Sequence, residues 1–295
     1  MDYIRRIIDK DLDLRVQAFG AINVLGPKGC GKSRTCKERA KTNIEFEDEE
    51  KRSGYLKVAN TSPSLLLKMD RPILFDEWQD APAIWGTIRK ECDDNYCFGD
   101  FFLTGSSSKF VDTPHSGTTR ISTVEMLPMS LYETGESNGT ISLQELFDNP
   151  SKEISAVSNL NMEQLIFAAC RGGWPKCLVI KNDEAKLLVA RDYFYQICHN
   201  DITKIDGVKR NSDWCSAILK SYARNIGTLC NKSVLLSDST TIYKFSEDTY
   251  DSYVDVLNKL YVIKDYDAWC PQIRSEKYLR TPKKHLFIDP SIAIA

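Results

Sequence analysis

Residues 26–33 read GPKGCGKS, which has the spacing G-x-x-x-x-G-K-[ST]. The apolar segment 21–25 in front of it is typical of a strand, and the polar segment that begins at Lys32 is typical of a helix. Glycines in such a loop let the backbone curl, so that successive N–H groups point inward at phosphate oxygens. A chance match is the weaker interpretation, because a strand and a helix flank the motif as its context requires. The sequence therefore predicts a phosphate-binding loop.

The loop also predicts which side chains contact the ligands. Lys32 is expected to reach the β- and γ-phosphates of a nucleotide, and Ser33 to ligate Mg²⁺ through its hydroxyl. The helix that begins near Lys32 adds the positive end of its dipole. The expected cofactors are ATP and Mg²⁺. The residues expected to bind the nucleotide are Gly26, Pro27, Lys28, Gly29, Cys30, Gly31, Lys32, Ser33 and Arg34.

A second polar motif, Asp76-Glu77, follows the apolar segment 72–75. A carboxylate at this position can hold Mg²⁺ opposite Ser33, either directly or through water. The adjacent Glu77 can polarise the attacking water as a general base. The alternative is that Asp76 caps the next helix and Glu77 is a solvated charge. The nearby phosphate loop favours the functional interpretation of both residues.

Two further motifs are weaker candidates. The segment TGSS (104–107) follows the apolar segment 101–103, and Thr104 or Ser106 would sense the γ-phosphate or orient water. Ser and Gly are also common in ordinary turns, so this interpretation stays open. Arg120 would supply positive charge to the transferring phosphoryl group, in cis or from a neighbouring subunit. A single arginine is more often part of a surface or structural ion pair.

Short apolar segments separated by helical stretches predict an α/β fold, with a parallel sheet of the P-loop NTPase type covered on both faces. The expected strands are 21–25, 72–75, 101–103 and 121–126, whereas the charge-rich stretch 34–55 leaves a further core strand uncertain. Ligands of such sheets bind beyond the carboxyl ends of the strands. The three polar motifs begin where the first three of these strands end, as a shared site requires.

The chain divides into three expected parts. They are a P-loop ATPase core (1–135), a connector with a helical lid (136–182) and a mainly helical C-terminal domain (183–295). In the core, the first 15 residues read as an amphipathic helix. Late in the chain, two helices followed by a hairpin are compatible with a winged helix-turn-helix.

Composition limits the remaining classes. The net charge of −2 gives no overall electrostatic reason to bind nucleic acid, so any basic surface would be local. The N-terminus is charged throughout, unlike a signal peptide, and the apolar runs are too short to span a bilayer. We therefore expect a cytoplasmic protein with no membrane partner. The 10 cysteines include no C-x-x-C pair, which favours reduced thiols over disulfides or zinc.

At the level of longer motifs, the sequence resembles a known family. The stretches that carry the resemblance are GPKGCGKS, PILFDEWQDAPAIW, FFLTGSS, HSGTTRIS, MLPMSLYETGES, RGGWP, SYARNIGT and TPKKHLFIDPSIA. They are similar to those of the uncharacterised prokaryotic AAA-type P-loop ATP-binding proteins that have a C-terminal domain of unknown function. The resemblance implies an ATPase core followed by a winged-helix-like module. Many relatives continue into a region that resembles restriction endonucleases, so a nuclease function is not carried over, and whether this chain is a truncated form stays open.

Residue by residue, the resemblance implies the same site as the motifs do. It assigns residues 26–33 to phosphates and Mg²⁺, Asp76 and Glu77 to the acidic pair, and Thr104 or Ser106 to the sensor. Arg120 occupies the arginine position of the family's HSG-x-x-R segment.

The leading functional prediction is Mg²⁺-dependent ATP hydrolysis coupled to conformational change, in a regulatory or DNA-associated setting. One alternative is a nucleotide-binding switch or DNA-binding module with negligible turnover, and another is a P-loop phosphotransferase. The acidic pair favours hydrolysis, because a hydrolase must activate water. Duplex DNA is a candidate partner of the C-terminal domain, although a basic run is usually a solvated surface, and the oligomeric state stays open. The basic residues are Arg274, Lys277, Arg280, Lys283, Lys284 and His285.

Overall fold

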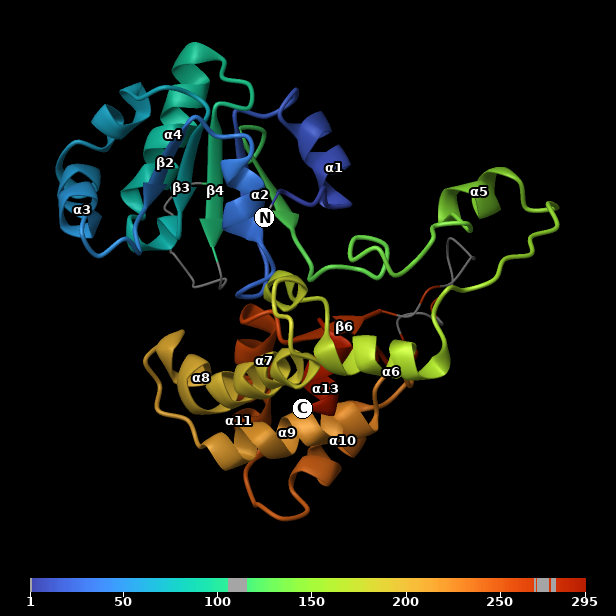
Figure 1. Ribbon diagram of the computed structural model, residues 1–295. Coiled ribbons are helices and arrows are strands. Elements are labelled where there is room, and N and C mark those ends of the chain that lie inside the picture. Colours follow the sequence, from blue (N-terminus) through green and yellow to red (C-terminus); the bar gives the residue numbers. More distant parts are fainter. Residues whose placement is uncertain (1, 106–115, 268, 270–275, 277–279) are drawn as a thin grey trace.

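The structure is a computed structural model that describes residues 2–105, 116–267, 269, 276 and 280–295. An α/β part built from the first half of the chain lies against a mainly helical C-terminal part, and helix α5 (Leu143–Asp148) projects from the body on an extended arm (Figure 1). No helix among the described residues is long and apolar enough to cross a membrane.

The described residues of the α/β part form a five-stranded sheet in the order β2-β3-β4-β1-β5, and all its pairings are parallel. The predicted P-loop type of α/β fold is thereby confirmed. The charge-rich stretch that left a strand uncertain contains β2, which pairs with β3. The strands are β1 (Ala21–Leu25), β2 (Thr42–Glu45), β3 (Ile73–Asp76), β4 (Phe101–Gly105) and β5 (Ile121–Glu125).

Alternate side chains of each strand point to opposite sides of the sheet, and helices cover both sides. Phe101 and Leu103 of β4 pack on one side and Phe102 on the other. Helices α1 (Ile8–Arg15) and α2 (Lys32–Lys37) cover the Phe102 side. The opposite side is covered by α3 (Arg52–Thr61), η1 (Pro63–Lys68), η2 (Trp78–Asp80) and α4 (Ala83–Asn95).

The amino-terminal helix is shorter than predicted. It begins at Ile8 rather than at the start of the chain, and residues 2–6 form an arm without helical structure. The prediction was wrong there because the arm has other partners. Asp9 accepts a hydrogen bond from the backbone N–H of Arg6 at 2.6 Å, and the Arg6 side chain is buried beside the phosphate loop.

The described C-terminal part is mostly helical, as predicted. Its core contains Tyr222, Tyr250 and Leu257, and an isolated bridge joins Leu229 to Lys284 of an antiparallel strand pair. The described elements that follow α5 along the chain are α6 (Met162–Arg171), η3 (Pro175–Leu178), α7 (Asp183–Gln196), the π-helix η4 (Ile197–Asp201), α8 (Ile202–Lys204), α9 (Ser212–Arg224), α10 (Lys232–Ser239), α11 (Glu247–Lys259), β6 (Ile263–Tyr266), β7 (Lys284–Phe287) and α13 (Pro290–Ile294).

The segment RGGWP (171–175) joins the two parts. The backbone N–H of Gly173 donates to Asp289 Oδ2 at 2.8 Å, and Gly173 O accepts from the N–H of Met129 at 2.7 Å. A Cβ atom at Gly173 would lie 2.1 Å from Met129 O, so only glycine fits. Trp174 Nε1 adds a hydrogen bond of 3.0 Å to Ser291 Oγ. These contacts fix the C-terminal part next to the core.

Candidate nucleotide-binding site

The phosphate loop lies between the end of β1 and the start of α2. Gly26, Gly29 and Gly31 have φ values of 151°, 75° and 107°, a region that other residues rarely adopt. At Gly26, a Cβ atom would lie 2.2 Å from Met126 O. The loop therefore has the curled backbone that the spacing of its glycines predicted.

Lys32 and the loop carbonyls form a compact unit. Lys32 Nζ donates to Gly26 O and Pro27 O, each at 2.9 Å, and the side chain is buried. The ammonium group thus lies inside the curl of the loop, where phosphate oxygens would approach its amides.

Ser33 and Asp76 come from different elements and meet at the carboxyl end of the sheet. Ser33 Oγ donates to Asp76 Oδ1 at 2.7 Å. Thr104 Oγ1 donates to the same oxygen, because Asp76 and Thr104 are register partners in the parallel strands β3 and β4. A hydroxyl and a carboxylate are oxygen ligands of the kind that Mg²⁺ prefers, so the donor set fits this ion. The chain brings the two residues predicted to hold the metal into direct contact.

Glu77 begins the turn that follows β3. Its φ and ψ of 54° and 48° are left-handed, which is uncommon for a residue with a side chain and carries strain. The residue is largely buried, and its carboxylate accepts a hydrogen bond from Gln79 Nε2. The backbone conformation turns the chain sharply at the end of β3, next to the loop.

Glu47, just after β2, adds to the acidic edge of the sheet. Burial raises the pKa of Glu47, and the negative charges of Glu77, Asp76 and Asp80 raise it further, while Lys28 opposes them. The carboxyl ends of β2 and β3 therefore concentrate negative charge beside the loop, as a cation site requires.

The remaining predicted residues are placed differently. Arg120 precedes β5 and hydrogen-bonds through its backbone to Ala21 at the start of β1, so it lies at the amino ends of the strands. A five-residue strand separates that edge from the loop by about 15 Å. Arg120 Nε instead pairs with Asp93 at 2.6 Å. The predicted role of Arg120 in cis is therefore wrong, and a role in trans stays a prediction. Ser106 lies outside the described residues.

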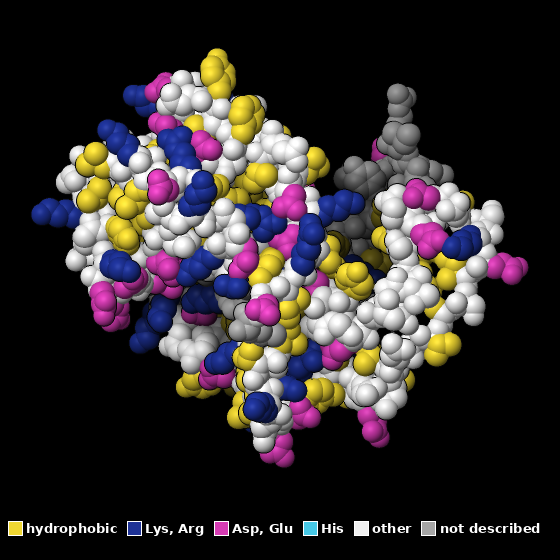
Figure 2. Space-filling model, turned by 45° about the horizontal axis from the view of Figure 1, so that its top comes forward, with side chains coloured by type: hydrophobic (Ala, Val, Ile, Leu, Met, Phe, Trp, Pro, Cys, Tyr) yellow, Lys and Arg dark blue, Asp and Glu magenta, His cyan; other side chains and the backbone are white. Residues whose placement is uncertain are grey.

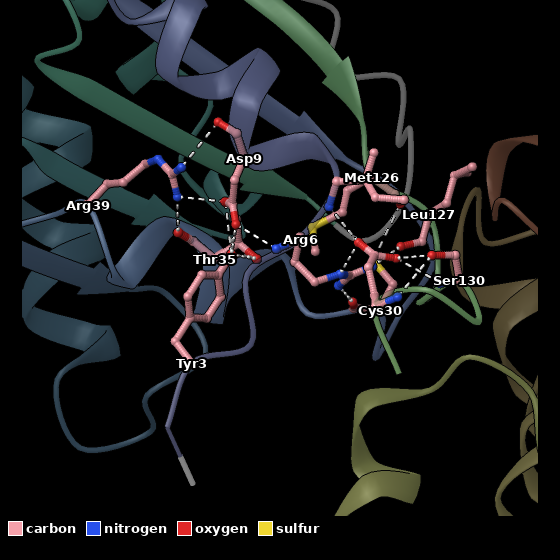
Figure 3. Close-up of polar contacts among 11 residues, drawn as sticks. Tyr3, Arg6, Asp9, Cys30, Thr35, Arg39, Met126, Leu127 and Ser130 are labelled. Atoms are coloured by element: carbon pink, nitrogen blue, oxygen red, sulfur yellow. Dashed lines mark hydrogen bonds and ion pairs between the residues drawn. The ribbon is translucent and has the colours of Figure 1, made fainter. Parts of the chain in front are cut away.

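The phosphate loop is also held by residues that the sequence motifs did not reveal (Figure 3). Arg6 donates to Cys30 O and Leu127 O, both at 2.7 Å, and pairs with Glu133 at 2.8 Å. The two charged side chains are each only 5% exposed. Burial alone would raise the pKa of Glu133, but hydrogen bonds from the backbone N–H groups of Ser130 and Ile7, together with Arg6, lower it.

Cys30 is buried inside this support. Burial raises the pKa of its thiol above the ordinary value, so the group stays protonated at neutral pH. This favours a packing role over a redox role for the cysteine in the loop.

A cavity of about 360 Å³ opens next to the loop. It lies between the amino-terminal arm, the start of α2 and η3, and its lining is largely apolar. The lining residues are Asp2, Tyr3, Ile4, Arg6, Gly31, Arg34, Thr35, Met129, Pro175 and Leu178. Tyr3 is fixed at its rim, since its hydroxyl bonds to Asp9 at 2.9 Å and to Thr35 Oγ1 at 3.1 Å (Figure 3).

The parallel sheet and the loop geometry are those of a P-loop NTPase. Residues 18–135 match a family model described as "AAA domain", and residues 162–295 match one described as "Domain of unknown function (DUF8612)". The chain therefore carries an AAA-type P-loop domain followed by a separate domain of unknown function, which confirms the resemblance seen in the sequence.

A solved structure agrees at the level of the fold. The Walker-type ATPase PABY2304 of Pyrococcus abyssi has a TM-score of 0.55 and 14% identity, and the match covers 99% of this chain and 95% of that one. The match to a DNA replication initiation factor covers 85% of this chain and 86% of that one at 13% identity, with a TM-score of only 0.27. The search of curated proteins found no match.

Proposed function

We propose that the protein binds Mg²⁺-ATP at residues 26–34 and hydrolyses it, with turnover coupled to movement between the core and the C-terminal part. One observation carries the proposal, namely the 2.7 Å contact between Ser33 Oγ and Asp76 Oδ1 at the open end of the phosphate loop. A kinase would use the same loop, but the buried Glu77 next to Asp76 favours activation of water.

The residues divide the work of hydrolysis among them. The loop amides and Lys32 hold the β- and γ-phosphates, and Ser33 and Asp76 hold the metal. Mg²⁺ would neutralise charge on the phosphate oxygens. Glu77 accepts a proton from water as the water oxygen attacks the γ-phosphorus, and ADP leaves.

The cavity beside α2 suits the nucleobase. Its size and apolar walls fit a flat aromatic ring, and it adjoins Gly31 at the end of the loop. Pro175 forms part of the wall, and its Cγ lies 3.5 Å from where a Cβ of Gly31 would be. Because Pro175 is the last residue of the segment that joins the two parts, a bound base would contact both. This supports coupling between occupancy of the site and the position of the C-terminal part.

Phosphate release from ATP tests the proposal. Lys32→Ala is expected to abolish nucleotide binding, whereas Glu77→Gln is expected to retain ATP and to slow hydrolysis by about 10²-fold or more. The exposed Lys41 and Glu49 offer matched controls, so Lys41→Ala and Glu49→Gln should behave as the wild type. A wild-type rate in Glu77→Gln would remove Glu77 as the general base, and absence of turnover in the wild type would reject hydrolysis.

A second candidate is DNA association through the C-terminal part. It is supported by the order α9, α10, α11, β6 and β7, with the bridge at Leu229, which is the order of a winged helix-turn-helix. However, α11, the third helix of such a unit, presents acidic side chains to solvent, and these repel phosphates. They are Glu247, Asp248, Asp251 and Asp255.

The basic residues give DNA binding only limited support. Lys283 and Lys284 are exposed, whereas His285 is buried, and Arg274 and Lys277 lie outside the described residues. On the face drawn in Figure 2, basic and acidic side chains are interspersed. Binding to duplex DNA that weakens with salt and is lost when Lys283 and Lys284 become alanine would establish this candidate. Binding that survives both substitutions would exclude this surface.

A further inference from the structure

We propose that Gln79 is a positioning residue for Glu77, whose side-chain amide sets the carboxylate in place for water activation. The inference deepens the proposed hydrolysis and rests on it. The inference rests on the hydrogen bond that Gln79 Nε2 donates to Glu77 Oε2. The two residues are two positions apart in the same turn.

The turn that carries Gln79 is firmly held. Trp78 is buried, stacks on Trp85 with ring centroids 4.9 Å apart, and donates from Nε1 to Asn23 Oδ1 at 3.2 Å. The N–H of Ala81 donates to Trp78 O at 2.8 Å and closes the turn. The backbone is thus held on both sides of Gln79, and from this position its Nε2 donates to the Glu77 carboxylate.

The other end of the Gln79 side chain has a distinct environment. Oε1 is buried and has no hydrogen-bond partner among the described residues. It lies against Gly105 at the end of β4, where a Cβ atom would come within 2.9 Å of it. The carboxamide therefore fills the space between the end of β4 and Glu77. Any larger residue at 105 would push it away from the carboxylate.

A buried acceptor without a partner is rare in native proteins and calls for a reason. Here the reason is the donor on the same amide. Turning the amide around to satisfy Oε1 elsewhere would aim an oxygen at the Glu77 carboxylate and break the existing bond. The orientation that leaves Oε1 unpaired is the one that holds Glu77.

The two neighbours of Gln79 show that the turn itself does not need this bond. Trp78 is anchored through its ring, and Asp80 pairs with Arg52 at 3.0 Å. Both contacts hold the turn without involving the bond from Gln79 to Glu77. What Gln79 adds is the direction of one carboxylate, which is the property that proton transfer depends on.

The test is ATP hydrolysis under single-turnover conditions, with ATP affinity measured separately. Gln79→Ala is expected to lower the hydrolysis rate about 10- to 100-fold, because misplacement of a catalytic group by about 1 Å has an effect of this order. The Kd for ATP should change less than about twofold, since Gln79 is outside the phosphate loop. Gln79→Glu keeps the shape, loses the donor and adds a repelling charge, so its rate should fall at least as far.

A double-mutant comparison separates positioning from a structural role. In a Glu77→Gln background, Gln79→Ala should cause no further loss, because its effect passes through the carboxylate that is already absent. A structural role would lower the rate by the same factor in both backgrounds. Gln17, which is exposed and donates to Asp13 O, offers a control in which Gln17→Ala leaves the rate unchanged.

Three outcomes would overturn the inference. They are a wild-type rate in Gln79→Ala, additive losses in the double variant, and, if Gln79→Ala does not fold, a wild-type rate in Gln79→Glu. An inactive wild type is a separate result, because it rejects the proposed hydrolysis itself and this inference with it.

Discussion

Lys28 of the phosphate loop and Asp201 of the C-terminal part form an ion pair with 2.8 Å between Nζ and Oδ1. Asp201 is the last residue of the π-helix η4, an unusual element that is frequent at functional sites. The pair borders a cavity of about 550 Å³ between the loop and α7. It is a direct link between the proposed phosphate site and the helical part of the chain.

Breaking this link should favour nucleotide binding. Asp201→Asn releases Lys28, which can then turn toward the phosphates, and we expect the Kd for ATP to fall about two- to fivefold, the range of a partly exposed pair. The measurement is titration with a fluorescent ATP analogue. Asp192→Asn, in the same cavity lining, is the control and should leave the Kd unchanged. A weaker affinity in Asp201→Asn would show that the pair supports binding.

The buried pair of Arg6 and Glu133 should dominate the stability of the amino-terminal arm. Arg6→Ala leaves the Glu133 carboxylate buried without its cation, and we expect a loss of about 3–5 kcal/mol in the free energy of unfolding. Urea denaturation of the full chain measures it. Arg5→Ala removes the neighbouring arginine, whose pair with Asp13 is exposed, and should cost less than about 1 kcal/mol. Equal losses in the two variants would contradict the assignment.

His285 should make the stability of the C-terminal part depend on pH. A hydrogen bond with Asp265 at 2.8 Å raises the pKa of His285 above its ordinary 6.5, against the effect of burial. Because the pKa is higher in the folded state, the stabilisation is fully present below about pH 6.5 and is lost as the pH rises through the folded-state pKa.

In denaturation experiments, the contribution of His285 to the free energy of unfolding of the wild type should therefore be larger at pH 6 than at pH 8.5. Asp265→Asn should reduce that difference. Asp267→Asn, which removes an exposed pair with Lys283, should keep it. An unchanged difference in Asp265→Asn would assign the pH dependence to other groups.

Gly173 should tolerate no side chain. Its Cβ would meet the backbone of Met129, which cannot move aside without disturbing the junction, so Gly173→Ala should cost about 1–3 kcal/mol in the free energy of unfolding. Gly54, in α3, has open space around its Cβ position, and Gly54→Ala should be neutral or stabilising by up to about 1 kcal/mol. Thermal denaturation of both variants distinguishes them, and a similar midpoint for the two would argue against the close packing at Gly173.

Sequence spacing predicted the parts of the site that are local in the chain. The loop from Gly26 to Ser33 is set by its own glycines, and Asp76 was found because it ends an apolar strand. The predicted cis role of Arg120 failed because of its position relative to its strand. Arg120 precedes its strand, and the direction of a parallel strand places such a residue at the edge opposite the loop.

Long-range partners could not be read from the sequence. Arg6 and Glu133 are 127 positions apart, and nothing local marks either as buried. The strand β2 was hidden because only Ile44 of its four residues is fully buried, while the strand ends on Glu45 and a run of charged residues begins at Glu47. Gln79 carries no motif signal of its own, since its role depends on the left-handed backbone of Glu77.

The contact between Gly173 and Asp289 has a consequence for how the protein is made. The two residues are 116 positions apart, so a ribosome has released the whole sheet and its loop long before the segment that anchors the 171–175 turn emerges. Pro175, a wall of the proposed base pocket, is therefore secured only after Asp289 has been synthesised. A nascent chain can curl its phosphate loop early, but it gains a complete nucleotide pocket only once the segment around Asp289 has emerged.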